Sequence, residues 1–87
     1  MKGYVYVLQN TKGTYYVGST NDLARRVDEH WRGKNKATKY NGIWKLVFYK
    51  EYENVLDARK IEVKLKRFKR RDFIHRIVKE KEILTDP

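Results

Sequence analysis

The sequence predicts a small α+β domain with the element order β-β-α-β-α-α, in which helices flank a three-stranded, mainly antiparallel sheet. Two observations support this prediction. Aromatic and β-branched residues gather in short runs, and in other segments apolar residues recur every three or four positions. A chain of 87 residues has room for one hydrophobic core. We therefore expect a single domain over residues 1–87, with a central part at about 3–68 and a C-terminal helix at about 71–82.

The N-terminal segment predicts a β-hairpin followed by a helix. Residues 3–8 (GYVYVL) favour a strand, residues 10–13 (NTKG) supply a turn, and residues 14–18 (TYYVG) favour the returning strand. Residues 19–21 (STN) offer N-cap candidates for the helix, and Asp22 falls in its first turn. The apolar stripe of this helix consists of Leu23, Val27 and Trp31, and the helix ends at Gly33.

The second half of the chain predicts a loop, a strand and two helices. Residues 34–42 are polar and basic, which is typical of a loop, and residues 44–52 (WKLVFYKEY) favour the third strand. Asn54 can cap a helix whose third position is Asp57. The apolar stripe of that helix consists of Ala58, Ile61, Leu65 and Phe68, and the stripe of the final helix includes Phe73, Ile74, Ile77 and Val78.

The charge of the chain indicates a polyanionic partner. Lys and Arg number 21 against 11 Asp and Glu, which gives a net charge of +10. Such a charge attracts phosphate backbones without regard to their sequence, although a small protein can also be merely basic. No segment joins a basic face to a large apolar one, so we expect no membrane partner. The chain has no cysteine and no N-terminal apolar stretch, and we expect a cytoplasmic protein.

Several charged residues lie beside the predicted buried stripes. On a helical wheel Arg25 points away from the stripe of the first helix, whereas Arg26 and His30 lie at its border. In the next helix Glu62 lies close to the centre of the stripe, and Lys66 follows one turn later. A snorkelling arginine and a Glu62–Lys66 helix pair would explain these positions without any function. A carboxylate near a core must otherwise be hydrogen-bonded or hold a cation.

The tyrosines of the hairpin are the third unusual feature. Alternation along a strand places Tyr4 and Tyr6 on one face of the first strand, and Tyr15 and Tyr16 on opposite faces of the second. Most tyrosines in strands pack with the hydroxyl in contact with water. Only their neighbours can decide whether one of them takes part in chemistry.

Together these residues resemble the motifs of the GIY-YIG endonuclease superfamily, which includes homing endonucleases and the N-terminal domain of a DNA-repair excinuclease. The chain is most similar to small, single-domain bacterial members, over nearly its whole length, and the match is most specific over residues 16–30 and in a Lys39-Tyr40 pair. The first motif has Tyr4 and Val5 where the family has Gly and Ile, and the second has Val17 in place of Ile. The matching positions are Tyr4-Val5-Tyr6, Tyr16-Val17-Gly18, Arg26, His30 and Glu62.

The resemblance implies a metal-dependent endonuclease that hydrolyses phosphodiester bonds with one Mg²⁺ or Mn²⁺ ion held by Glu62. Arg26 would stabilise the transition-state oxygens, and Tyr16, with Tyr6 as the second candidate, would activate the water. His30 would relay a proton or hold a phosphate. The residues expected to bind the nucleic-acid backbone are Arg25, Lys39, Tyr40 and Lys66, while Trp31 would pack or stack.

Two other functions remain open at this point. A catalytically silent DNA- or RNA-binding module of the same fold would need the basic surface but would not need Glu62. An interaction module whose basic helices dock on an acidic protein is the third candidate. For the enzyme we expect a monomer that acts on DNA in preference to RNA, with either weak sequence preference or a partner protein that supplies targeting.

Overall fold

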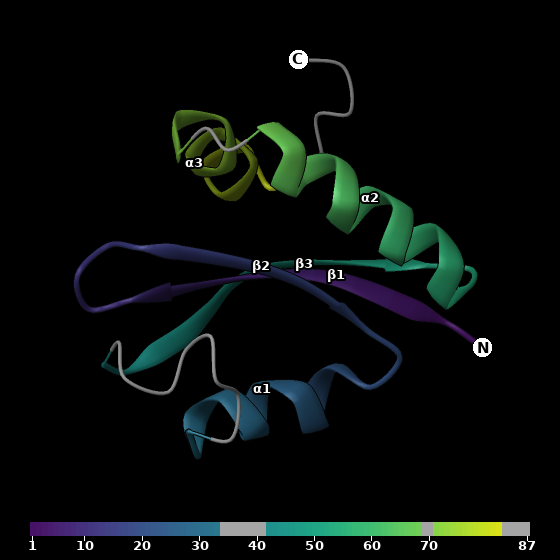
Figure 1. Ribbon diagram of the computed structural model, residues 1–87, viewed down its shortest axis with the longest axis horizontal. Coiled ribbons are helices and arrows are strands. Elements are labelled where there is room, and N and C mark those ends of the chain that lie inside the picture. The colour runs from purple at the N-terminus through teal and green to yellow at the C-terminus, as the bar shows by residue number, and fades with distance from the viewer. Residues whose placement is uncertain (34–41, 69–70, 83–87) are drawn as a thin grey trace.

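The computed structural model describes residues 1–33, 42–68 and 71–82, and it confirms the predicted α+β arrangement. The elements are, in order, β1 (Gly3–Asn10), β2 (Tyr15–Thr20), α1 (Leu23–Trp31), β3 (Trp44–Tyr52), α2 (Val55–Phe68) and α3 (Arg71–Glu80). The strands form one antiparallel sheet with the order β2-β1-β3, so β1 is the central strand. Helix α1 covers one face of this sheet, and α2 and α3 cover the other (Figure 1).

Local capping sets where the helices begin and end. Helix α1 is capped by Asp22, whose side chain accepts a hydrogen bond from the backbone N–H of Arg25, so the prediction of a cap at 19–21 is wrong by one residue. Asn54 caps α2 as predicted, because its Oδ1 accepts a hydrogen bond of 2.9 Å from the backbone N–H of Asp57. Helix α3 ends at Glu80 instead of residue 82, and Lys81 follows with a φ of 56°. Most of the predicted loop, residues 34–41, lies outside the described part of the chain.

The sequence predicts one hydrophobic core, but the buried side chains form two clusters, because helices cover both faces of the sheet. On the face covered by α2 and α3, side chains of β1 and β2 meet buried residues of the two helices; the members include Val5, Val7, Val17, Ala58, Leu65 and Ile77. On the opposite face, Tyr6, Leu8 and Trp44 are buried together, with Tyr16 and Leu23 packed against them. Tyr15 packs on the first face and Tyr16 on the second, which confirms the alternation predicted from the sequence.

The packed face of α1 differs from the prediction. The helical wheel predicts Trp31 in the buried stripe, but its side chain is 60% exposed, whereas His30 is only 3% exposed. The reason is that His30 has a polar partner inside the protein, described below, which a hydrophobicity pattern does not reveal. Among the described residues, no helix has both the length and the apolar character needed to cross a membrane.

Candidate active site at the edge of strand β2

The site starts from Tyr6, in the middle of the central strand. Tyr6 is fully buried, and it lies directly opposite Gly18 of β2. A Cβ atom at Gly18 would come within 2.4 Å of the Tyr6 hydroxyl oxygen. Gly18 therefore leaves the space in which the Tyr6 ring crosses beneath β2 and brings its hydroxyl towards the edge of the sheet.

Helix α1 supplies a histidine to this hydroxyl. The Tyr6 Oη atom lies 3.0 Å from Nε2 of His30. Burial, and after it the nearby positive charge of Arg26, lower the pKa of the His30 imidazole to about 4. Because His30 is therefore neutral at pH 7, its Nε2 can accept the proton that the Tyr6 hydroxyl donates. Burial in turn raises the pKa of the Tyr6 phenol to about 12, although hydrogen bonding to Arg26 acts in the opposite direction.

Arg26 lies one turn before His30 and is partly held in place. Its Nη1 atom donates a hydrogen bond of 3.2 Å to Oε1 of Glu29, and its side chain is 37% exposed. The Nε atom is buried and has no hydrogen-bond partner among the described residues. A buried donor without an acceptor costs free energy, and this N–H lies inside the protein on the side of Tyr6. Arg26 is thus held by Glu29 and by the neighbouring Tyr6 hydroxyl, which raises the pKa of the guanidinium, while 37% of its side chain stays exposed.

Helix α2 brings a carboxylate to the other side of β2. The Glu62 side chain is 17% exposed, its Oε2 lies 2.8 Å from Nζ of Lys66, and its Oε1 accepts a short hydrogen bond from the hydroxyl of Ser19. Ser19 points to the α2 face of the sheet because it alternates with Gly18 along β2. The contacts with Ser19 and Lys66 thus hold the carboxylate against the edge strand.

Tyr16 connects the two halves of the site. Its ring centroid lies 5.0 Å from that of His30 and 6.4 Å from that of Tyr6. The Lys66 ammonium, which also binds Glu62, lies 5.4 Å from the centre of the Tyr16 ring. Side chains from both faces of the sheet therefore meet around β2, which forms an edge of the sheet.

The structure brings six of the predicted residues to this one place: Tyr6, Tyr16, Arg26, His30, Glu62 and Lys66. Arg25 is exposed at the preceding position of α1, as the helical wheel predicts. Lys39 and Tyr40 lie outside the described residues, so their predicted contacts stay predictions. Trp31 is exposed and has no stacking contact with the tyrosines among the ring contacts of the described residues.

Reasoning from the sequence missed two contributors. Ser19 is predicted only as a helix cap, although strand alternation puts it on the face that α2 covers, where it binds Glu62. Glu29 has no predicted role, and it holds Nη1 of Arg26. The three-residue spacing of Arg26 and Glu29 on one helix is the signal that could have revealed this pair.

The donor set suits a divalent ion that keeps most of its water. Within residues 1–33, 42–68 and 71–82, no group of three or more histidine, aspartate or glutamate side chains could hold a metal ion. Glu29 is bound to Arg26, and the other carboxylate of the site, that of Glu62, has the Ser19 hydroxyl beside it. Mg²⁺ binds proteins in this sparse way, through one or two carboxylates with water and phosphate oxygens completing its shell. The residues present therefore fit one such ion, which would take the place of the Lys66 ammonium at Oε2 of Glu62.

Comparison with known protein families gives a match over most of the chain. The model of the GIY-YIG catalytic domain matches residues 2–75. The chain belongs to the GIY-YIG family. The GIY-YIG match contains every residue of the site just described, from Tyr6 on β1 to Lys66 on α2. Membership thus supports the resemblance seen in the sequence.

Similar proteins are found in several bacteria. The chain is 34% identical over 85 residues to the UPF0213 protein YE0453 of Yersinia enterocolitica, covering 97% of this chain and 81% of that protein. It is 39% identical over 70 residues to a UPF0213 protein of Streptococcus pneumoniae, covering 79% and 71% respectively. The solution NMR structure of the UPF0213 protein BH0048 from Bacillus halodurans superposes with a TM-score of 0.59 and 30% identity, over 93% of this chain and 87% of that one.

Proposed function

We propose that this GIY-YIG domain is an endonuclease that hydrolyses phosphodiester bonds in nucleic acid, with DNA preferred over RNA, and that it uses one divalent metal ion. The observation that supports the proposal is the meeting of Tyr6, Tyr16 and His30 with Arg26 on one side of β2 and Glu62 on the other. Phosphodiester hydrolysis needs a base for the attacking water and positive charge for the developing oxyanion, and these side chains provide both.

Tyr16 is the better candidate for the base. Tyr6 is fully buried, its pKa is raised to about 12, and its hydroxyl is already bound to His30, so Tyr6 is suited to positioning the imidazole. Tyr16 is only half-buried, and it has the Lys66 ammonium close to its ring. The ammonium can offset the negative charge of the phenolate, which is the form of the tyrosine that accepts a proton. Tyr16, as the phenolate, would therefore take the proton of the attacking water and become a neutral phenol, and His30 would pack against its ring.

Arg26 would bind a non-bridging oxygen of the scissile phosphate. Its planar guanidinium has the buried Nε–H without an acceptor among the described residues, and Glu29 fixes the orientation of the group through Nη1. Glu62 would hold the divalent ion, and such an ion would supply positive charge for the phosphate and the leaving oxygen. In this scheme the Lys66 ammonium leaves the Glu62 carboxylate and binds a phosphate oxygen of the nucleic-acid strand.

The proposal is tested by cleavage of plasmid and branched DNA with Mg²⁺ or Mn²⁺, alongside binding to the same DNA. Glu62→Gln should abolish cleavage and retain binding, because no lysine or arginine is removed. Arg26→Ala should reduce the cleavage rate by roughly 10²–10³-fold, which is the usual cost of removing one oxyanion donor. Glu53→Gln, which removes an equal charge at an exposed position, is the control and should cleave at the wild-type rate.

One observation favours the silent binding module as the second candidate. Both oxygens of Glu62 are bound, to Ser19 and to Lys66, and a structural ion pair would look the same. For this candidate, wild type and Glu62→Gln would bind DNA or RNA equally, and neither would cleave any substrate with any metal. That outcome would refute the endonuclease and leave the nucleic-acid partner in place. A protein partner that supplies targeting stays part of the endonuclease proposal.

A further inference from the structure

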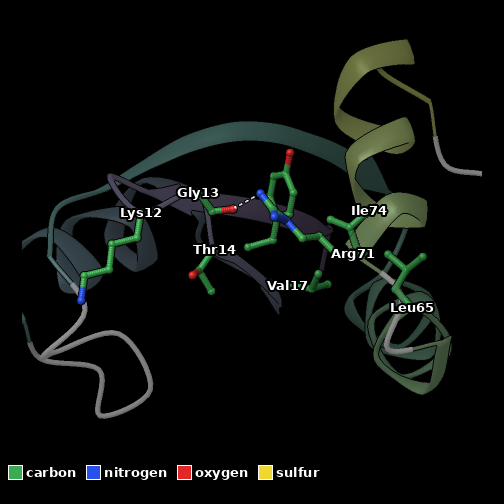
Figure 2. A pocket seen from close by; sticks show the side chains of 8 residues that line it. Lys12, Gly13, Thr14, Val17, Leu65, Arg71 and Ile74 are labelled. Atoms are coloured by element: carbon green, nitrogen blue, oxygen red, sulfur yellow. Dashed lines mark hydrogen bonds between the residues drawn. The ribbon is translucent and has the colours of Figure 1, made fainter.

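A second concave site lies on the face of the sheet opposite α1. It is a pocket of about 310 Å³ between the β1–β2 hairpin, the end of α2 and the start of α3 (Figure 2). The pocket is lined by Lys12, Gly13, Thr14, Tyr15, Val17, Leu65, Arg71 and Ile74. Its volume is at the lower end of the range of roughly 300–1,000 Å³ that is typical of small-molecule sites. The pocket is separate from the Tyr6–Tyr16 site, because strand alternation sends Tyr15 and Tyr16 to opposite faces.

The pocket combines an apolar floor with an aromatic wall and a cation. Val17, Leu65 and Ile74 supply the floor, and all three are buried members of the core. The guanidinium carbon of Arg71 lies 5.7 Å from the centre of the Tyr15 ring, which is a cation–π distance. The Tyr15 hydroxyl lies 2.8 Å from Nδ1 of His75, which does not line the pocket, and this contact fixes the position of the ring.

The position of Arg71 depends on a glycine of the hairpin. Figure 2 shows Arg71 extending from α3 across the pocket to the hairpin, where its Nη2 donates a hydrogen bond of 2.9 Å to the carbonyl oxygen of Gly13. Gly13 has a φ of 85°, and a Cβ atom there would lie 3.1 Å from that nitrogen. A planar cation is thus held at the mouth of an apolar pocket. Of the eight lining residues, two are cations and none is a carboxylate.

We propose that this pocket binds one unpaired nucleotide of a nucleic-acid strand. The base would enter the apolar space and stack against Tyr15 and Arg71, and its phosphate would contact the Arg71 guanidinium, with Lys12 at the rim. Stacking on an aromatic ring beside an arginine is how proteins hold single-stranded bases without regard to their identity. A base within a duplex cannot enter such a pocket, because both of its faces are covered by its neighbours.

The place of the pocket relative to β2 gives this nucleotide a role. Tyr15 and Val17 of β2 face the pocket while Tyr16, between them, faces the candidate active site. On α2, Leu65 lines the pocket and the next residue, Lys66, contacts Tyr16 and Glu62. A strand that passes around the edge of β2 would place one nucleotide in the pocket and a neighbouring phosphate at Glu62. This role rests on the proposed endonuclease function, whereas binding in the pocket does not.

Binding is tested on the full chain without metal, so that cleavage plays no part. We expect adenosine 5′-monophosphate to shift the amide resonances of Tyr15, Val17, Leu65 and Ile74 in a saturable manner. Adenosine and inorganic phosphate should each bind at least tenfold more weakly than the nucleotide, because each makes half of the contacts. If inorganic phosphate binds as tightly as the nucleotide, the pocket is a simple anion site and the proposal is overturned. Shifts confined to Tyr16 and Glu62 would overturn it equally.

Variants separate a binding role from a structural one. Tyr15→Leu keeps an apolar side chain but removes the ring, and Arg71→Gln removes the cation; each should weaken nucleotide binding at least tenfold. Arg76→Gln removes the same charge from the exposed side of α3, where Arg76 pairs with Glu80, and should leave the affinity unchanged. Urea unfolding of each variant identifies loss of folding. An Arg71→Gln protein that is folded and binds normally would refute the proposal.

Oligonucleotides identify the source of the nucleotide. A single-stranded oligonucleotide should displace a fluorescent adenosine nucleotide from the pocket, and a blunt duplex of equal length should displace it at least tenfold less well. Equal displacement by the duplex would show that unpaired bases are not recognised and would overturn the proposal. If the pocket binds single strands but no substrate is cleaved, the endonuclease proposal fails while the nucleotide site stands.

Discussion

Lowering the pH from 7 to 4 should destabilise the protein because His30 is buried as a neutral imidazole. In the folded state its pKa is lowered to about 4, whereas the unfolded chain has the usual value of about 6.5. Between these two values the unfolded state binds more protons, so the free energy of unfolding falls as the pH falls through this window and levels off below it. The difference corresponds to about 3 kcal/mol, at 1.36 kcal/mol per pKa unit. That is a large share of the ~5–15 kcal/mol that stabilises a typical domain.

The measurement is urea unfolding at several pH values between 7.5 and 4 for wild type and for His30→Gln. Glutamine can accept the hydrogen bond of Tyr6 but does not titrate, so the wild type should lose about 3 kcal/mol more than the variant over this range. NMR titration of the imidazole gives the folded pKa directly, and His75→Gln assigns the resonance. Parallel loss of stability in the two proteins, or a midpoint near 6.5 for His30, would refute the reasoning.

Further substitutions test other contacts through urea unfolding. Gly18→Ala should cost about 1–3 kcal/mol, because its Cβ would lie 2.4 Å from the Tyr6 hydroxyl, and an unchanged midpoint would show that the ring moves freely. Asn54→Ala removes the cap that binds the N–H of Asp57 and should cost about 1 kcal/mol, whereas Asn54→Asp, which can still cap, should cost much less. Trp31→Ala should change stability by less than about 1 kcal/mol because the side chain is 60% exposed; a larger loss would mean that it packs as the helical wheel predicts.

The sequence was sufficient for the fold because the signals for it are local. Alternation identified both faces of the hairpin, and the turn residues located the return of the chain at residues 10–13. Asn54 was identified as a cap because capping requires only residues three positions apart. The cap of α1 was misplaced because Thr20 also binds the backbone N–H of Asp22, at 3.1 Å, so several small polar residues compete for the same helix end.

From the sequence, the candidate site was predictable only where a charged residue falls beside the buried apolar stripe of a helix. Arg26 and Glu62 are predicted in this way; Arg26 lies beside Tyr6 of the central strand, and Glu62 binds Ser19 of the edge strand. The wheel places His30 at a half-covered border, yet it is almost fully buried, because its partner Tyr6 is 24 residues away in the sequence. The hydrogen bond from Ser19 to Glu62 spans 43 residues. Contacts of this kind depend on how strands and helices pack, and no helical wheel contains that information.

Strand β2 has a free side, since among the described strands its only neighbour in the sheet is β1. Tyr16 on one face of the sheet and Glu62 on the other both contact Lys66 at this free side. A second polypeptide that hydrogen-bonded along β2 would separate the tyrosines from the glutamate. One that paired with β3, at the opposite edge of the sheet, would leave both accessible at the edge of β2. In the proposed endonuclease, self-association along β2 would thus block cleavage, whereas association along β3 would leave the site open.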